Sequence, residues 1–447
     1  MIKPMLILSL GAALMLGLLP LITNATEANR LGDPVAGNNK AALCAACHGL
    51  DGIGLSPEYP NLAGQKQAYI IKQLKAFKSG LREDASMQAM AASLNDDDML
   101  NLASYYSQLT NPAADLSPDS TPNSTSGSAS DSGTEPPITT TSSVCSVTKI
   151  EASSIEFPET VFVTMKGCGA IETFPTRSTW EGGANMLYTA ISPDGHYLFS
   201  TSPSSNKLYV FDTQTGKKVA IITVGNAPKG VKVHPNGKRV YVSNEASSTI
   251  SVIDIASMSV VNTITVQKAP HNVRFTRDGS LAYVTLQGGA GIGVINTVKE
   301  EIVNVIPVPG IIGPHNLDLS SDEKIAYVRD FVGNLAVLEL VTGNVLKVIQ
   351  VGNGHGGVDV APDDSFVATA AISDNKISII DTVSLTTQHI VVGQGPHGIR
   401  TSKDSQWIYV TLTKDNQVVV INAKTMTIEK RFIVGDFPFW IAVNGNP

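Results

Sequence analysis

The chain has 447 residues, a formal net charge of −7 and few aromatic side chains among many glycines. This length is comfortable for two or three domains. The acidic balance excludes the basic face that nucleic-acid binding needs, so we expect no nucleic-acid partner.

The first 25 residues carry a single charge, at Lys3, which is followed by an apolar run from Met5 to Ile22. The small residues Thr23-Asn24-Ala25 offer a cleavage site, so we predict a signal peptide over residues 1–25 and a periplasmic protein. An uncleaved anchor is the alternative, because the 18 apolar residues just reach spanning length. If the segment is cleaved, we expect the protein to meet the membrane only during export or through a peripheral contact.

Residues 26–110 have helical periodicity. Asp33 and Pro34 suit the N-cap and first turn of one helix, and Asn95 with the acidic residues after it suits the start of another. Three apolar residues at helical spacing predict a helix between them: Ile70, Leu74 and Phe77. Three short helices have too little apolar surface for a strong core, so we expect a buried cofactor to supply the rest.

The run Cys44-Ala45-Ala46-Cys47-His48 has the spacing of a c-type haem attachment site. One helical turn brings both thiols to the same edge of the porphyrin, and His48 then falls under the iron as an axial ligand. A thioredoxin-like pair would follow a strand, and a zinc site would need two more ligands, yet His48 is the only histidine of this region. A plain disulfide would make no use of His48. We therefore predict one covalent haem c on Cys44, Cys47 and His48.

Residues 111–143 consist almost entirely of proline, serine, threonine, aspartate, glycine and alanine. Such a segment cannot bury enough apolar surface to offset its ordering entropy. It is predicted to be a flexible linker between a helical domain and a β-domain at residues 144–447.

The β-domain is a repeat. Equivalent positions fall 42, 42, 44, 41, 41 and 42 residues apart, at Met186, Pro228, Pro270, Pro314, His355, Pro396 and Pro438. Each unit reads as four strands, with Asp-Gly or Asn-Gly turns between the first two in several units. Four strands every 41–44 residues predict a β-propeller.

The ends of the β-domain are expected to close the ring. Six units are complete, and the orphan strand Phe439–Val443 needs partners, which the β-rich piece Val144–Phe174 would supply. A disulfide between Cys145 and Cys168 would staple this composite blade. The predicted fold is thus multidomain, with a small all-α domain followed by an all-β propeller of seven blades, eight being the alternative.

The helical domain resembles a domain of the c4-type class I cytochromes c. The resemblance covers nearly all of residues 30–110, through Cys44–Gly49, Pro60–Gln65, Gln73–Gly80 and Met87–Ala91. It implies that Met87, the first of a Met-x-x-Met pair, is the sixth iron ligand, with Met90 as the runner-up. It also implies that the carbonyl of Pro60 orients the ligand histidine. The c4 proteins carry two such domains, whereas this chain has one.

The propeller resembles YVTN-type propellers, through Tyr241-Val242-Ser243-Asn244, and also the d1-haem propeller of cytochrome cd1 nitrite reductase. In the second resemblance, His271 matches the segment that supplies the iron ligand of haem d1, although the d1 domain is larger and eight-bladed. Position in the repeat also places four histidines of neighbouring blades near one channel mouth: His271, His315, His355 and His397. They would bind a metal or a second haem, or would simply bond to backbone as repeat consensus.

Three functions are compatible with these features, and one of them is a propeller binding module to which the cytochrome merely reports. The other two involve electron transfer. The first is an electron carrier, with His48 and Met87 on one haem c and a propeller that docks a redox partner protein or another binding partner. The second is an oxidoreductase of the cytochrome cd1 type, with haem d1 or a metal in the propeller. We favour the carrier, because a His/Met iron with both axial sites filled passes single electrons and binds no substrate.

Overall fold

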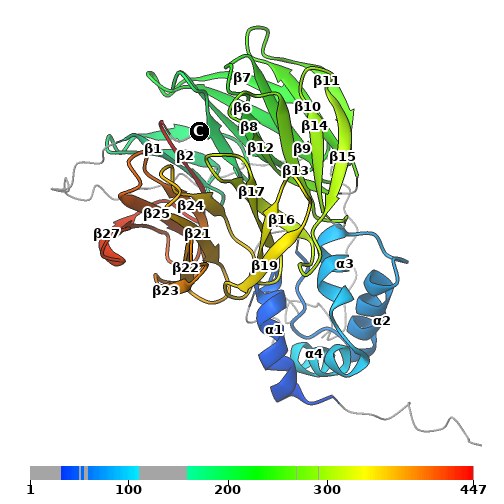
Figure 1. The fold of residues 1–447 in the computed structure, drawn as a ribbon. Helices are drawn as coiled ribbons and strands as arrows, with labels where there is room; N and C mark the ends of the chain where they lie inside the picture. Colours follow the sequence, from blue (N-terminus) through cyan, green and yellow to red (C-terminus); the bar gives the residue numbers. More distant parts are fainter. Residues whose placement is uncertain are drawn as a thin grey trace, which may run out of the picture.

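The computed structural model describes residues 32–49, 52–54, 59–109, 159–267, 269–289 and 291–445. A group of helices, blue in Figure 1, lies against one end of a large propeller of β-strands. The signal peptide predicted over residues 1–25, the linker predicted over residues 111–143 and Cys145 lie outside the described residues. Among the helices that are described, none is both long and apolar enough to cross a membrane.

The helices are α1 (Pro34–His48), α2 (Gln67–Lys78), α3 (Ala85–Ala92) and α4 (Asp96–Gln108). Two predicted starts are confirmed: Asp33 Oδ1 accepts the backbone N–H two residues on, at 2.8 Å, and Asn95 forms a reciprocal capping box with Asp98. The prediction of three helices was wrong, because it missed α3. This helix has only eight residues and begins where the Asp84 side chain accepts the N–H of Met87. Two turns are too short for a periodic signal.

The core of the helical domain forms where α1 and α2 pack on α4. Ile70 and Leu74 of α2 lie in one buried cluster with Tyr106 of α4, as their spacing predicted. The crossing of α1 and α4 depends on Gly37, where a Cβ atom would lie 2.1 Å from the carbonyl oxygen of Asn101. Any larger residue would push the two helices apart.

The described part of the β-domain forms seven four-stranded sheets, which confirms the seven-bladed propeller. Six blades are built from consecutive strands: β4 (Thr189–Ile191), β5 (Tyr197–Ser202), β6 (Lys207–Asp212) and β7 (Lys218–Thr223); β8 (Pro228–Val233), β9 (Arg239–Asn244), β10 (Thr249–Asp254) and β11 (Ser259–Thr265); β12 (Pro270–Phe275), β13 (Leu281–Leu286), β14 (Gly291–Asn296) and β15 (Glu301–Pro307); β16 (Pro314–Leu319), β17 (Ile325–Asp330), β18 (Asn334–Glu339) and β19 (Val345–Gln350); β20 (Val358–Val360), β21 (Phe366–Ala371), β22 (Lys376–Asp381) and β23 (Thr387–Val391); β24 (Pro396–Thr401), β25 (Trp407–Leu412), β26 (Gln417–Asn422) and β27 (Thr427–Ile433). The first strands of successive blades contact one another and so surround the propeller axis.

The seventh blade joins the two ends of the β-domain. Its strand order is β28 (Pro438–Val443), β1 (Val161–Met165), β2 (Ala170–Phe174) and β3 (Thr179–Glu181). The predicted closure is therefore confirmed for the described part of the proposed partner segment. Thr164 links this blade to the next, because its hydroxyl donates to the carbonyl of Leu187 at 2.7 Å and accepts the N–H of Trp440 at 2.9 Å. Closure in this way gives the last strand of the chain a partner from the start of the β-domain.

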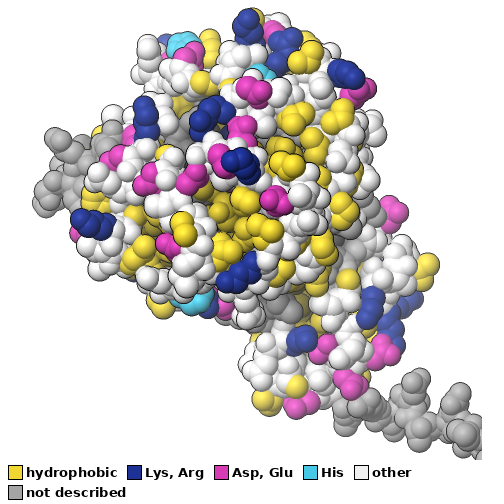
Figure 2. Space-filling model, in the orientation of Figure 1, with side chains coloured by type: hydrophobic (Ala, Val, Ile, Leu, Met, Phe, Trp, Pro, Cys, Tyr) yellow, Lys and Arg dark blue, Asp and Glu magenta, His cyan; other side chains and the backbone are white. Residues whose placement is uncertain are grey.

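Charges of both signs lie on the face of the propeller that Figure 2 shows. Figure 2 shows lysine and arginine side chains interspersed with aspartate and glutamate on the face in view, around groups of apolar side chains. This face presents no uniformly basic surface.

Aspartates at the tight turns make the propeller sensitive to acid. Asp278 accepts the N–H of Ser280 at 2.9 Å and Asp254 accepts that of Ser257 at 2.8 Å, and these backbone hydrogen bonds lower the pKa of both carboxyls. A carboxyl with a lowered folded pKa adds stability above its unfolded pKa and loses it as the pH falls through the folded value. We therefore expect the midpoint temperature of thermal unfolding, measured by calorimetry, to fall when the pH is lowered below about 4, which is the pKa of aspartate in an unfolded chain. Asp278→Asn should lose less of its unfolding temperature over this pH range than the wild type does. A wild-type unfolding temperature that does not change between neutral and acidic pH would contradict the expectation.

Candidate functional site

The last turn of α1 carries the predicted haem attachment site. Cys44 and Cys47 are both half-buried and neither forms a disulfide, which contradicts the plain-disulfide alternative. Burial raises the pKa of each thiol to about 11, so both stay protonated at neutral pH. The pair lies in the last turn of a helix and follows no described strand, whereas a thioredoxin-like pair follows a strand. Within the described residues, neither cysteine belongs to a group of three or more metal-ligating side chains, which a zinc site would need. Covalent attachment to a porphyrin needs neither a preceding strand nor such a group.

His48 is held in the orientation of an iron ligand. The residue is 5% exposed, and its Nδ1 lies 2.9 Å from the carbonyl oxygen of Pro60. Because a carbonyl oxygen can only accept, Nδ1 carries the proton and Nε2 is left with its lone pair. Burial lowers the pKa of His48, which keeps the imidazole neutral as a metal ligand must be. The hydrogen bond that the resemblance implied for Pro60 is present.

The methionines of the helical domain differ in burial. Met90 is 9% exposed and Met99 is 1% exposed, both as buried residues of the interior. Met87 is half-buried on α3 and packs against the edge of the helical core. Met87 is thus the more accessible member of the Met-x-x-Met pair.

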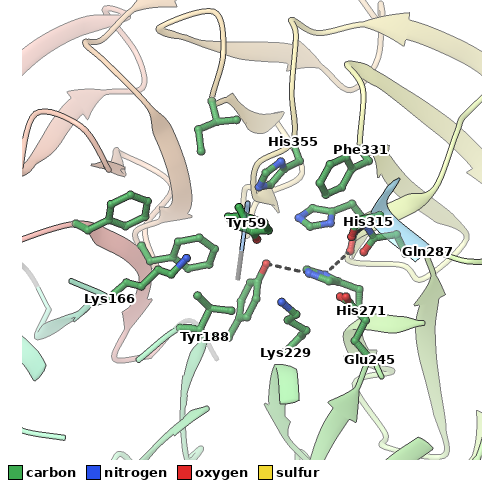
Figure 3. Close-up of a pocket in the computed structure, with 15 residues that line it drawn as sticks. Tyr59, Lys166, Tyr188, Lys229, Glu245, His271, Gln287, His315, Phe331 and His355 are labelled. Atoms are coloured by element: carbon green, nitrogen blue, oxygen red, sulfur yellow. Dashed lines mark hydrogen bonds between the residues drawn. The ribbon is translucent and has the colours of Figure 1, made fainter. Parts of the chain in front are cut away.

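The haem-attachment end of the helical domain lies over the mouth of the propeller. Gln287 Nε2 donates to Ser86 Oγ at 3.2 Å, and the Lys166 ammonium lies 5.6 Å from the centre of the Tyr59 ring. Tyr59 is also 6.1 Å from His48, ring centre to ring centre. In Figure 3, Tyr59 lies in the middle of the ring of propeller residues. No sequence signal indicated this arrangement, because it depends on contacts between segments far apart in the chain.

The four predicted histidines meet at this mouth, and all are buried. Neighbouring rings lie 3.8, 4.7 and 5.1 Å apart between centres along the series His271, His315, His355 and His397. Two of them bond to backbone as the consensus alternative expected: Nδ1 of His271 to the carbonyl of His315 at 3.0 Å, and Nδ1 of His397 to that of Phe439 at 3.1 Å. The other two have no such bond to backbone within the described chain.

His271 differs from the other three. Its Nε2 lies 3.2 Å from the Tyr188 hydroxyl, so both ring nitrogens already have partners. Figure 3 shows both bonds. The cavity between these residues and Tyr59 has a volume of about 40 Å³. A few water molecules or one ion fit such a space, whereas pockets for larger ligands take about 300–1,000 Å³. The residues present do not fit a haem d1 in this cavity.

Comparison with known proteins identifies both domains. Residues 36–110 match the cytochrome c family model, and residues 175–282 match that of YNCE-like β-propellers. Cytochrome c-554(548) of Halomonas halodenitrificans is 47% identical over 79 residues, which are 17% of this chain and 95% of that protein. Cytochrome c4 of Pseudomonas aeruginosa is 41% identical over 80 residues, which are 18% of this chain and 40% of that protein.

Two further comparisons concern an electron acceptor and the propeller fold. A thiosulfate dehydrogenase electron acceptor of Thiomonas intermedia is 44% identical over 71 residues, 16% of this chain and 33% of that protein. Kuenenia stuttgartiensis hydrazine synthase aligns over 67% of this chain and 94% of its own, with a TM-score of 0.54 and 18% identity, which shows the fold alone. Because a 47% identical cytochrome is covered over 95% of its length, this chain belongs to the cytochrome c family through its helical domain, which is followed by a YNCE-like β-propeller.

Proposed function

We propose that this protein is a periplasmic electron carrier with one covalent haem c, whose propeller docks a redox partner protein. Cys44 and Cys47 attach the haem, and His48 and Met87 are its axial ligands. The observation that carries the proposal is the hydrogen bond from His48 Nδ1 to the carbonyl of Pro60 at the end of a Cys-x-x-Cys-His helix, since it leaves Nε2 free for iron. Electron transfer is also the function that the cytochrome relatives support.

The residues around this site suit single-electron transfer. A bound haem would supply the redox iron, and the His48 imidazole and the Met87 thioether would both ligate it, which would leave no position on the metal for a substrate. The soft thioether favours the ferrous state and raises the reduction potential. Export would be directed by residues 1–25, with residues 111–143 linking the cytochrome domain of residues 26–110 to the propeller of residues 144–447.

The propeller gives the carrier a second surface near the haem edge. The interface residues Tyr59 and Ser86 contact the propeller mouth, where Lys166 and Lys229 lie close enough to Cys47 to lower the pKa of its thiol against the raising effect of burial. These lysines would also stabilise the reduced form of an adjacent redox centre through their positive charge. The proposal is that a partner docks on the propeller and exchanges electrons with the haem at this side.

An enzyme of the cytochrome cd1 type has less support. The propeller has seven blades where the d1 domain has eight, the cavity holds about 40 Å³, and His271 Nε2 is occupied by Tyr188. The remaining observation in favour of a second redox centre is the group of three other histidines, which concerns a metal ion and not a haem.

The absorption spectrum of the exported protein, with two matched variants, tests the proposal. Wild type should show a single c-type haem with the weak long-wavelength band of iron–methionine coordination. Met87→Ala should abolish this band and lower the reduction potential by on the order of 0.1–0.3 V, within the roughly 0.8 V range that axial ligands span. Met90→Ala, on the same helix, should keep both.

Three results would count against the proposal. A haem that acid–acetone extracts would show a second, non-covalent cofactor. Loss of the methionine band in Met90→Ala but not in Met87→Ala would show that Met90, and not Met87, is the iron ligand. An iron that binds small ligands readily in the wild type would mean an open axial site, which a carrier does not have.

A further inference from the structure

Three histidines from three successive blades converge on one point of the propeller axis. His315 lies on β16, His355 just before β20 and His397 on β24, and we refer to them as the histidine cluster. One ring nitrogen from each lies within 4.8 Å of the others, and the side chains are 2, 7 and 0% exposed. In Figure 3, His315 and His355 point toward the space beneath Tyr59. Three imidazoles at this spacing form a ligand set typical of Zn, Cu, Fe or Ni.

The nitrogens of the histidine cluster are left without hydrogen-bond partners. Both ring nitrogens of His315, Nδ1 of His355 and Nε2 of His397 are buried and have no partner in the described structure. A buried ring nitrogen normally has a partner, because burial without one costs the full desolvation of the group. One ligand at this point can satisfy three of these atoms together, one from each ring.

His397 is already arranged as a metal ligand. Its Nδ1 lies 3.1 Å from the carbonyl oxygen of Phe439, which fixes the proton on Nδ1 and leaves the lone pair on Nε2. Metal-binding histidines usually donate their second ring N–H to a carbonyl or carboxylate in this way. His271, whose Nε2 takes part in a hydrogen bond with Tyr188, lies beside the histidine cluster but is not available to it.

The charged residues around the histidine cluster favour a singly charged metal ion over a doubly charged one. His315, His355 and His397 would each bind a metal as a neutral imidazole, since a ligating ring nitrogen carries no proton. Arg329 and Lys229 face the cluster with positive charge, and the cluster itself contains no carboxylate or thiolate; Glu245 lines the same cavity. A dication would meet more repulsion here than a monocation. Phe331, stacked on His355 at 4.5 Å, adds an apolar wall that disfavours high charge further.

We propose that His315, His355 and His397 bind one copper ion, held mainly as Cu(I), at the mouth of the propeller beneath the cytochrome domain. Metal–nitrogen bonds are about 2 Å long, so three nitrogens around one ion lie about 3.5 Å apart, and small ring movements close the present spacing. Imidazole nitrogens suit copper, and three neutral ligands tolerate its univalent form. The site goes beyond the electron-carrier proposal and does not depend on it.

Metal titration of the full-length, haem-loaded protein tests the site. Cu(I), buffered with bicinchoninate under reducing conditions, should bind at one equivalent to the wild type. His315→Phe should weaken this binding at least 100-fold, since even outer-shell changes at metal sites cost 10–100-fold. The matched control is His389→Phe, which changes an exposed histidine of an outer strand and should bind copper as the wild type does.

Thermal unfolding of the haem-loaded protein without copper tests whether His315 acts as a metal ligand or only stabilises the fold. Phenylalanine fits this ring of aromatic residues, since the equivalent position of the seventh blade is Phe439, whose ring centre lies 3.9 Å from that of His397. His315 makes no hydrogen bond through its ring, so metal-free His315→Phe should unfold at the wild-type midpoint or higher. Added Cu(I) should raise the midpoint of the wild type and leave that of the variant unchanged.

The outcomes divide cleanly. Equal copper binding by wild type and His315→Phe would overturn the site, and so would tighter binding of Zn²⁺ than of Cu(I) at one equivalent. X-ray absorption of the copper-loaded wild type needs no variant, and it should show two or three imidazole nitrogens on Cu(I). Sulfur ligands in that spectrum would place the copper elsewhere, and the absence of bound copper would exclude the proposal.

Discussion

Replacing Cys44 and Cys47 together by alanine is expected to remove all covalently bound haem from the protein. Each thiol would form one thioether bond, and His48 alone would not hold the porphyrin through denaturation. The measurement is the haem stain of the denatured protein on a gel, together with its c-type absorption, after export in a host with haem-attachment machinery. The wild type should be stained and the double variant should not.

The same variant should also weaken the helical domain selectively. The buried cluster of that domain is small, with eight buried apolar residues around α4 within the described chain, so the cofactor is expected to supply much of its core. Calorimetry should show that the transition of the propeller persists while that of the helical domain is lost or moves to lower temperature. Met90→Leu, a volume-conserving change in the interior, serves as the control and should keep its haem. Covalent haem in the double variant would refute the attachment site.

Asp359→Ala is expected to destabilise the propeller by about 3–5 kcal/mol, the cost of breaking a buried ion pair by removing one partner. Asp359 is 0% exposed. Its Oδ1 accepts a hydrogen bond from Nη1 of Arg400 at 2.6 Å, and its Oδ2 accepts the backbone N–H and the hydroxyl of Thr401 at 2.7 and 2.6 Å. Arg274 lies 4.0 Å away and also pairs with Asp318. These groups come from the first strands of four neighbouring blades, β12, β16, β20 and β24, so they join the blades around the axis.

Removal of the carboxylate would take away the ion-pair partner of the buried Arg400, while Arg274 keeps Asp318. Burial and the two arginines already lower the pKa of the neighbouring Lys232 far below its usual value. The measurement is the midpoint of guanidinium unfolding, followed by tryptophan fluorescence. The matched control is Glu301→Ala, which breaks an exposed pair with Lys299 and should cost less than about 1 kcal/mol. A similar small cost for both variants would show that the buried pair contributes little.

Local patterns in the sequence account for much of the fold. The turn residues and the interval of 41–44 residues predicted the blades, and Asn95 predicted the start of α4, because turns and caps depend on residues a few positions apart. The Cys-x-x-Cys-His spacing likewise predicted that both thiols and His48 share the end of one helix. The closure of the ring was predictable for a different reason, since an unpaired strand beside an unpaired segment leaves few alternatives.

The short helix α3 was not predictable in the same way. Its eight residues span about two turns and carry no long apolar stripe, so the sequence there resembled a loop around a Met-x-x-Met pair. The Asp84 cap that begins it is recognisable only once the helix is known.

By itself, the sequence determined the two domain types and the presence of one histidine in each of several neighbouring blades, and it predicted the haem attachment residues. Only the tertiary structure decided which of these histidines act together. Tyr188 occupies His271, whereas His315, His355 and His397 keep unpartnered nitrogens within 4.8 Å of one another. It also decided that Tyr59 and Ser86 lie over the propeller mouth. The physical reason is the separation along the sequence between interacting residues. Turns, helix caps and the predicted haem attachment involve residues a few positions apart, whereas the hydrogen-bond partners of the histidine rings and the contacts between the domains involve residues tens to hundreds of positions apart.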